Sequence, residues 1–371
     1  MTSVQWRIGV EIELLAPVGL SRLDLALAIA DTVDGSVKRF FHPQSEPSLV
    51  PGRPVFHNLT LGYEVLDSKR QIVAFCVDDL TLQKDLNRAA KPNSGWYRIV
   101  SDDERLLRLI SQNTDPDLPL AQVMNTVAGL FGTSPECGSG GMIKVNDRLG
   151  CSIAIAAPLP GERERPCELI TIPIEVEHAS HLERLLRTAR ALHFQVPHEG
   201  ATHIHFDATA LKSAHAIRNL VNIYSTYHAI LKRLIGTNPN CRRLGLWSEE
   251  LTKTVNAPSF RKLPWAKARE QLMAANLTKF CDLNLMNFVH EFTDKNTIEV
   301  RILPVWLEAE PILQVASLFV AIFQTALTEE VFSQKETQAY SSEAARKFLM
   351  GLPLAAAQRQ YWLKTADCKQ S

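Results

Sequence analysis

The stretch Thr202–Ala208, "THIHFDA", alternates polar and apolar residues in the middle of the chain. Because successive side chains of a β-strand point to opposite faces, His203, His205 and Asp207 would share one face of a strand, with apolar residues on the other. Taken alone, this face indicates either a zinc site or the solvated face of an antiparallel sheet. The rest of the sequence has to decide between them.

Other segments have the same design. Glu11 and Glu13 alternate with apolar residues in "VEIEL", and Glu299 and Arg301 do so in "TIEVRIL". Glu168 precedes a β-branched run in "CELITIP". Each face by itself could simply be solvated, but solvated faces usually mix Lys, Thr, Ser and Glu. These faces carry almost only carboxylates, imidazoles and a guanidinium. If such strands are neighbours, they would form one charged face of the sheet, which we call the charged wall.

The order of the expected elements indicates an α+β protein. Connections between the expected strands are often short, and helical periodicity appears at 178–193, 213–236 and 308–330. This order predicts a mixed, mostly antiparallel sheet with helices packed on one side. Residues 1–330 are expected to form the catalytic domain, and residues 331–371 a helical C-terminal appendage.

Composition and charge narrow the class of protein. The 371 residues are 46% hydrophobic, and the 40 basic residues balance the 40 acidic ones. This balance is typical of a folded globular protein and argues against a general binder of nucleic acid or of anionic membranes. The most apolar window, 312–327, is too short to span a bilayer. Seven cysteines without a C-x-x-C pair, and charges close to the N-terminus, favour a cytoplasmic protein with free thiols.

The expected charged wall suits a divalent cation. Oxygen-rich ligation with a smaller share of imidazole is typical of Mg²⁺ or Mn²⁺ rather than of Zn²⁺. Carboxylates that hold such ions beside arginines are the apparatus of phosphoryl transfer. Arginines are available in two loops, as Arg163 and Arg165 in "PGERERPCE" and as Arg242 and Arg243 in "NPNCRRLG". The sequence has no P-loop, no G-x-G-x-x-G after a strand and no G-x-S-x-G elbow.

Four motifs in order resemble those of the amidoligase family, carboxylate–amine ligases with the fold of glutamine synthetase and glutamate–cysteine ligase. They are "GVEIE", "CELITIP", the H-x-H strand, and "KFCDLN" followed by "TIEVRIL", and they cover the chain from residue 9 to about residue 330. The resemblance implies a curved sheet with a charged concave face, as in the catalytic domain of glutamine synthetase. It also implies an enzyme that uses ATP and Mg²⁺ (or Mn²⁺) to form an amide or peptide bond through an acyl phosphate.

The resemblance further implies roles for single residues. Metal ions would be held by Glu11, Glu13, Glu168, His205 and Glu299. The nucleotide would contact His203, His205 and Asn284, with the loop arginines Arg163, Arg165, Arg242 and Arg243 as further candidates. Arg301 would contact the transferring phosphate or the substrate carboxylate, and Glu299 and Lys279 would complete the catalytic set. The substrates would be a carboxylate and an amine on a small metabolite, a peptide or a protein side chain.

Several alternatives stay open. A zinc hydrolase built on the H-x-H-x-D strand would need another ligand, and His215 and His228 lie on a helical pattern. A non-catalytic relative would bind nucleotide without turnover, although a decayed site has no reason to keep clustered carboxylates. The acid that would meet the amine is undecided, with candidates at Asp34 in "DGS", at 78–79 and at 102–103. No nucleic acid or membrane partner is expected, and the helical flanks could serve a homo-oligomer.

Overall fold

The protein is described by a computed structural model that covers residues 2, 4–47, 55–241, 243–291, 295–333 and 335–369. The chain folds as two compact units. The first unit consists of Met1–Ile12, Pro173–Arg187 and Gly200–Ser371, and the second of Glu13–Ile172 and Thr188–Glu199. Both units combine helices with antiparallel strands, so the predicted α+β class and the mostly antiparallel pairing are confirmed.

The sheet of the first unit joins strands that are far apart in the sequence. Its order is β11–β12–β10–β1, with bounds β11 (Leu283–Asn284), β12 (Thr297–Leu303), β10 (Thr202–Asp207) and β1 (Ile8–Leu15), whose last residues belong to the second unit. Each neighbouring pair is antiparallel. Gly9 lies opposite His205, and His205 lies opposite Glu299. The motifs "GVEIE", "THIHFDA" and "TIEVRIL" therefore lie on adjacent strands, as the sequence predicts.

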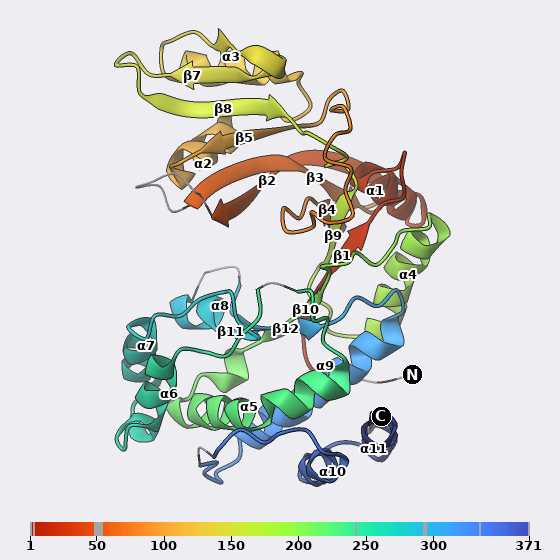
Figure 1. Ribbon diagram of the computed structural model, residues 1–371, viewed down its shortest axis with the longest axis vertical. Helices are drawn as coiled ribbons and strands as arrows, with labels where there is room; N and C mark the ends of the chain where they lie inside the picture. Colours follow the sequence, from red (N-terminus) through yellow and green to blue (C-terminus); the bar gives the residue numbers. More distant parts are fainter. Residues whose placement is uncertain are drawn as a thin grey trace. The chain divides into compact units, whose positions relative to one another are not determined.

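The apolar face of this sheet packs on two long helices, α5 (Ala214–Ile235) and α9 (Ala309–Ala326), which lie on the same side of the strands (Figure 1). The ring of Phe206 on β10 meets the ring of Phe323 on α9 edge to face, with 5.0 Å between their centroids. Val10, Ile204 and Ile298 are fully buried on the adjoining strands. Since strand side chains alternate, the charged residues between them point to the opposite face.

One of the predicted helices, α5, has clear signals at both ends. The side chain of Ser213 accepts a hydrogen bond from the N–H of Ala216 at the start of α5, and Gly236 ends this helix in the left-handed region with φ 78°.

By length and composition α9 could cross a membrane, but 78% of it is buried inside the fold. It therefore forms the core of the first unit.

The remaining helices of the first unit surround this core. The C-terminal helices pack on α5, where the ring of Phe348 stacks on that of Tyr227 at 4.3 Å, and Trp362 is 2% exposed. The bounds are α4 (His178–Ala191), which continues into the second unit, α6 (Glu249–Asn256), α7 (Trp265–Met273), α8 (Met286–His290), α10 (Ser342–Met350) and α11 (Ala356–Cys368).

The second unit contains the other strands of the same 12-stranded sheet and has its own apolar core. Its strand order is β9–β4–β3–β5–β8–β7–β6, and β2 pairs with β3. Helices α2 and α3 cover one face, where Leu107, Ile110 and Val127 pack on Leu61 and Ile99. The strands are β2 (Ser36–Pro47), β3 (Val55–Leu66), β4 (Ile72–Val77), β5 (Tyr97–Ser101), β6 (Glu136–Cys137), β7 (Ile143–Asn146), β8 (Ser152–Pro158) and β9 (Pro166–Thr171), and the helices are α1 (Arg22–Asp31), α2 (Glu104–Asn113) and α3 (Leu120–Leu130).

Candidate active site

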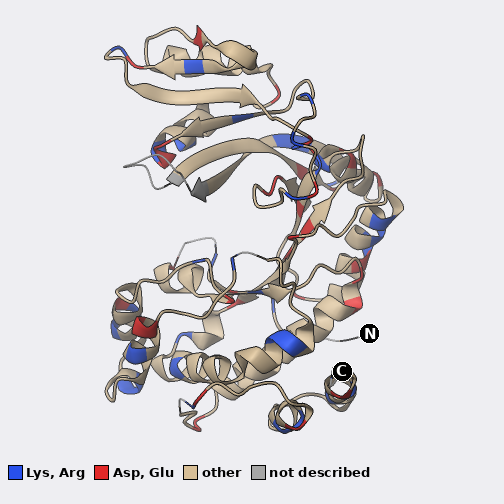
Figure 2. Ribbon diagram, viewed as in Figure 1, with Lys and Arg blue, Asp and Glu red and all other residues tan. Residues whose placement is uncertain are grey.

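The polar face of the first unit's sheet brings two carboxylates and two imidazoles together. Glu11 Oε1 lies 3.1 Å from His205 Nε2, and the other carboxylate oxygen of Glu11 lies 3.5 Å from His203 Nδ1. Glu299 Oε1 also lies 3.5 Å from His203 Nδ1. These four side chains are between 5% and 15% exposed. Acidic positions along β1 are visible in Figure 2. We call Glu11, His203, His205 and Glu299 the carboxylate–imidazole cluster.

A shift in strand register shapes this cluster. The pairing of β10 with β12 moves from Thr202↔Leu303 to Ile204↔Val300, so β12 has one residue more than β10 at this point. Arg301 and Ile302 of β12 thus lie opposite His203 of β10, as in a β-bulge. The guanidinium of Arg301 donates a hydrogen bond from Nη1 to Glu299 Oε1 at 2.5 Å. Arg301 and Glu299, two residues apart on β12, are thus in direct contact.

Neighbouring polar side chains hold the cluster in place. Thr297 Oγ1 lies 3.2 Å from His205 Nδ1, the ring nitrogen remote from Glu11. The amide of Asn284 on β11 donates a hydrogen bond of 2.8 Å to Glu299 Oε2 and accepts one of 2.9 Å from the N–H of Met286. Both oxygens of Glu299 are thus bound, one by Asn284 and one by Arg301. Such outer contacts fix the orientation of a ligating histidine or carboxylate.

The charges of the cluster stabilise one another. Burial favours the neutral form of Glu11, but the charge of His205 and the hydrogen bond from His203 outweigh it and hold the pKa of Glu11 well below its ordinary value. Burial alone would raise the pKa of Glu299, but the charges of His205 and Arg301 outweigh burial and lower this pKa. Burial acts against the imidazolium of His205, yet Glu11 and Glu299 raise its pKa above the ordinary value. The two carboxylates therefore favour the protonated form of the imidazole that lies between them.

The cluster has the donor set and the spacing of a metal site. Glu11, His205 and Glu299 each offer one ligand atom, and these three atoms lie within 4.8 Å of one another. Two oxygens and one imidazole nitrogen fit a hard divalent cation such as Mg²⁺ or Mn²⁺. A cation between them would take the place of the proton on His205, because a ligating imidazole must be neutral.

The additional ligands that a zinc hydrolase needs have other contacts. The side chain of Asp207 accepts a hydrogen bond of 2.8 Å from the N–H of Thr209 and lies 3.9 Å from Arg7, so it organises the turn after β10. His215 and His228 lie on α5 and contact the backbone carbonyls of Thr328 and Ser225. The H-x-H-x-D strand therefore does not supply a three-ligand zinc site from its own described residues.

Two predicted metal ligands belong to the second unit. Glu13 is 6% exposed near the end of β1. Glu168 lies on β9 opposite Val77 and is half-buried. Both carboxylates lie on strands, as the sequence predicts, and their role as metal ligands stays a prediction.

Arg163 and Arg165 make buried contacts within the second unit, and their predicted role in binding ATP stays a prediction. Arg163 is 5% exposed and donates hydrogen bonds to Asp78 Oδ1 at 2.6 Å and to the carbonyl of Leu82 at 2.6 Å. Arg165 is 6% exposed and donates to the carbonyl of Ala16 at 2.8 Å. Both guanidinium groups hold the loop before β9 together. Arg165 also binds Glu162, three residues before it. The other partners are Asp78 and the carbonyls of Leu82 and Ala16, which lie far along the chain and which the sequence alone does not reveal.

The second arginine loop and Lys279 lie in the first unit. Arg242 falls outside the described residues. The guanidinium of Arg243 lies 5.0 Å from the centroid of the Phe280 ring, and the ammonium of Lys279 lies 5.5 Å from the same centroid. Two cations that were predicted separately therefore meet at one aromatic ring.

Most of the chain, and not only this cluster, matches a known family. Residues 4–323 fit the family model described as "Putative amidoligase enzyme". The chain belongs to this family. The predicted resemblance is thereby confirmed, and family membership indicates a ligase that forms amide bonds. No curated protein matches the chain.

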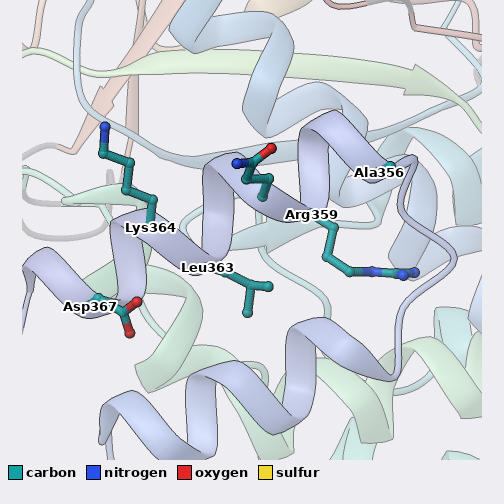
Figure 3. Close-up of a pocket in the computed structure, with 6 residues that line it drawn as sticks. Ala356, Arg359, Leu363, Lys364 and Asp367 are labelled. Carbon is teal, nitrogen blue, oxygen red and sulfur yellow. The ribbon is translucent and has the colours of Figure 1, made fainter.

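A surface depression elsewhere in the first unit contains none of the residues of the carboxylate–imidazole cluster. Figure 3 shows it along one helix, α11, where it is lined by Ala356, Arg359, Gln360, Leu363, Lys364 and Asp367. None of the predicted site residues lines it. The carboxylate–imidazole cluster is therefore the stronger candidate for the active site.

Two residues to which the sequence analysis gave no role, Thr297 and Asp282, make contacts next to the cluster. Thr297 begins "TIEVRIL", and its position on the polar face of that strand was a usable signal. Asp282 lies inside the quoted "KFCDLN", two residues before Asn284, and its environment is described below. Its role depends on partners more than thirty residues away, which no local pattern indicates.

Proposed function

We propose that this protein is an ATP- and Mg²⁺-dependent carboxylate–amine ligase that acts through an acyl phosphate. Membership of the amidoligase family supports the reaction class. The observation that carries the proposal is the set of Glu11, His205 and Glu299, whose ligand atoms lie within 4.8 Å of one another, with Arg301 bound to Glu299. This combination of hard ligands and an adjacent guanidinium suits the handling of a phosphoryl group.

The proposed reaction has two steps. An oxygen of the substrate carboxylate attacks the γ-phosphorus of ATP, the bond to the β–γ bridging oxygen breaks, and ADP leaves. The amine nitrogen of the second substrate then attacks the acyl carbon, inorganic phosphate leaves, and the proton of the amine passes to a base or to water. Bound Mg²⁺ would supply charge neutralisation for the phosphates, held by Glu11, His205 and Glu299.

The chain's own residues have distinct tasks in this proposal. The guanidinium of Arg301 stabilises the negative charge that develops on the transferred phosphoryl group. Its contact with Glu299 keeps it aligned, and Asn284 holds the other oxygen of that glutamate. Thr297 orients the imidazole of His205. Preset side chains of this kind reduce the reorganisation needed during the reaction.

The finer parts of the resemblance belong to the same proposal. We infer a curved sheet with a charged concave face, as in the catalytic domain of glutamine synthetase, with Glu13 and Glu168 as additional metal ligands. The substrates would be a carboxylate and an amine on a small metabolite, a peptide or a protein side chain. The protein would act in the cytoplasm, without nucleic acid or membrane partners.

The test is nucleotide turnover by the purified protein. With ATP and Mg²⁺ we expect ADP to form only when a carboxylate and an amine from a substrate panel are both present. Glu11→Gln and Glu299→Gln should abolish this turnover while the circular dichroism spectrum stays that of the folded protein. Condensation that proceeds without nucleotide would contradict the proposal. Stoichiometric zinc that survives dialysis would favour the hydrolase, and nucleotide binding without turnover across the panel would favour a non-catalytic relative.

A further inference from the structure

A buried aspartate lies beside the candidate active site. Asp282 is 1% exposed, and its carboxylate has three donors. The hydroxyl of Tyr224 donates to Oδ2 at 3.0 Å, and the ammonium of Lys232 donates to Oδ1 at 2.9 Å. The N–H of Gly245 also donates to Oδ1 at 2.9 Å. Burial, followed by the charge of Asp282, raises the pKa of Tyr224 well above its ordinary value.

The backbone of Asp282 makes two more connections. Its N–H donates to the carbonyl of Gly245 at 2.8 Å, so this residue and Gly245 are joined by two hydrogen bonds. Its carbonyl accepts a hydrogen bond of 2.9 Å from the N–H of Arg301. One residue thus joins the loop that contains Arg243, helix α5 through Tyr224 and Lys232, and the bulged part of β12.

The loop and the segment that Asp282 joins both carry cations. Arg243 precedes Gly245 by two residues, and Lys279 precedes Asp282 by three. Their charged groups lie 5.0 Å and 5.5 Å from the centroid of the Phe280 ring. The ring is 41% exposed, so this face of the protein is open to a ligand. Two cations beside one exposed ring give this surface a local positive charge, which attracts a multiply charged anion.

We infer that Arg243 and Lys279 form a binding site for a polyphosphate group and that Asp282 is the residue that positions it. The inference rests on the proposed function, because the polyphosphate of ATP is the anion that the reaction requires. Asn284, two residues after Asp282, binds Glu299. The segment 282–284 therefore anchors the arginine loop at one end and a proposed metal ligand at the other. Asp282 acts through Gly245 and does not itself contact the nucleotide.

The first measurement follows the loop without any ligand. Hydrogen–deuterium exchange of the peptide that spans 241–247 should become at least about fivefold faster in Asp282→Asn, because the N–H of Gly245 then loses its charged acceptor. Tyr224→Phe removes one donor only and serves as the milder variant if Asp282→Asn unfolds. Asp367→Asn is the matched control, because Asp367 pairs with Arg346 in the C-terminal helices. Unchanged exchange in a folded Asp282→Asn would overturn the positioning role.

The second measurement is a double-mutant cycle with two probes, inorganic tripolyphosphate and the ATP analogue AMP-PNP with Mg²⁺. Asp282→Asn and Arg243→Gln should each weaken the binding of both probes about tenfold. The double variant should bind about as weakly as Arg243→Gln alone, since Asp282 acts through the loop. Affinity for Mn²⁺ alone should change less than about twofold in all three variants, because the carboxylate–imidazole cluster is intact.

The outcomes separate this inference from the proposed function. Additive losses in the double variant, or full tripolyphosphate affinity in both single variants, would overturn the inference even if the protein is an active ligase. Tripolyphosphate binding that depends on Arg243 and Asp282, in a protein that forms no ADP with any substrate pair, would overturn the proposed function and support the inference.

Discussion

His205 and Glu11 are diagonal neighbours across the antiparallel pair of β10 and β1, with Nε2 and Oε1 3.1 Å apart. The residue directly opposite His205 is Gly9, and the residue directly opposite Glu11 is His203. Diagonal neighbours on one face of a sheet are within reach of long side chains. A Cβ added at Gly9 would lie 3.8 Å from Cβ of His205, an ordinary contact distance. The diagonal contact therefore follows from the strand register of β1 and β10.

The raised pKa of His205 predicts a pH-dependent metal affinity. The two carboxylates that surround it raise this pKa against the effect of burial, so the imidazole stays protonated up to a pH above its ordinary value of 6.5. A metal ion needs the neutral imidazole and must displace that proton. Apparent Mn²⁺ affinity should therefore rise about tenfold per pH unit below the pKa of His205 and level off above it.

Calorimetric titration of the protein with Mn²⁺ in two buffers of different ionisation enthalpy checks this prediction. The lowered pKa values of Glu11 and Glu299 keep both carboxylates ionised near neutral pH, so neither adds to the slope. His205→Gln should remove the proton release, and His228→Gln on α5 should keep it. A pH-independent affinity in the unmodified protein would contradict the assignment of His205.

Glu11→Gln should separate the two roles of this carboxylate. The amide keeps the size of the side chain but loses the charge that attracts both the cation and the imidazolium. We expect a loss of about tenfold to a hundredfold in Mn²⁺ affinity. NMR titration should also give a lower pKa for His205, because the charge of Glu11 is the main cause of its increase. Glu175→Gln is the control, since Glu175 is 70% exposed and pairs only with Arg7 among the described residues. An unchanged titration of His205 would show that this diagonal contact is absent in solution.

The polar strand faces of the site could be predicted from the local sequence pattern, but the contacts between distant segments could not. The alternation in "VEIEL", "THIHFDA" and "TIEVRIL" has a period of two residues, so each polar face could be predicted from the sequence. The register that brings His205 diagonal to Glu11, and the bulge at Arg301 and Ile302, depend on how distant strands pair. The same holds for Asp282, whose donors come from α5 and from the loop after it. Arg163 was predicted to bind a phosphate because it lies in a loop. Its buried partner Asp78 could be found only from the folded chain.

Thr297→Val should weaken metal binding without removing a ligand. The hydroxyl of Thr297 is 3.2 Å from His205 Nδ1 and sets the rotation of the ring, and valine keeps the shape while deleting this contact. We expect Mn²⁺ affinity to fall about tenfold, the lower end of the range for lost outer contacts of a ligating histidine. Thr297→Ser keeps the hydroxyl and should retain most of the affinity. If Thr297→Ser and Thr297→Val lower the Mn²⁺ affinity equally, the hydroxyl does not orient His205, and the effect comes from the changed packing of the side chain.

Arg163→Met tests whether this arginine is structural. Its guanidinium is 5% exposed and lies 2.6 Å from Asp78, a carboxylate that is itself fully buried and also 3.7 Å from Arg22. Removing one member of a buried ion cluster leaves uncompensated polar groups, so urea unfolding should report a loss of about 3 kcal/mol. Arg105→Met is the contrast, because Arg105 pairs with Asp103 on the exposed surface and its loss should change stability little. While Arg163→Met remains folded, its affinity for AMP-PNP with Mg²⁺ should equal that of the unmodified protein. A variant of full stability that no longer binds this analogue would instead restore the role in nucleotide binding that the sequence suggested.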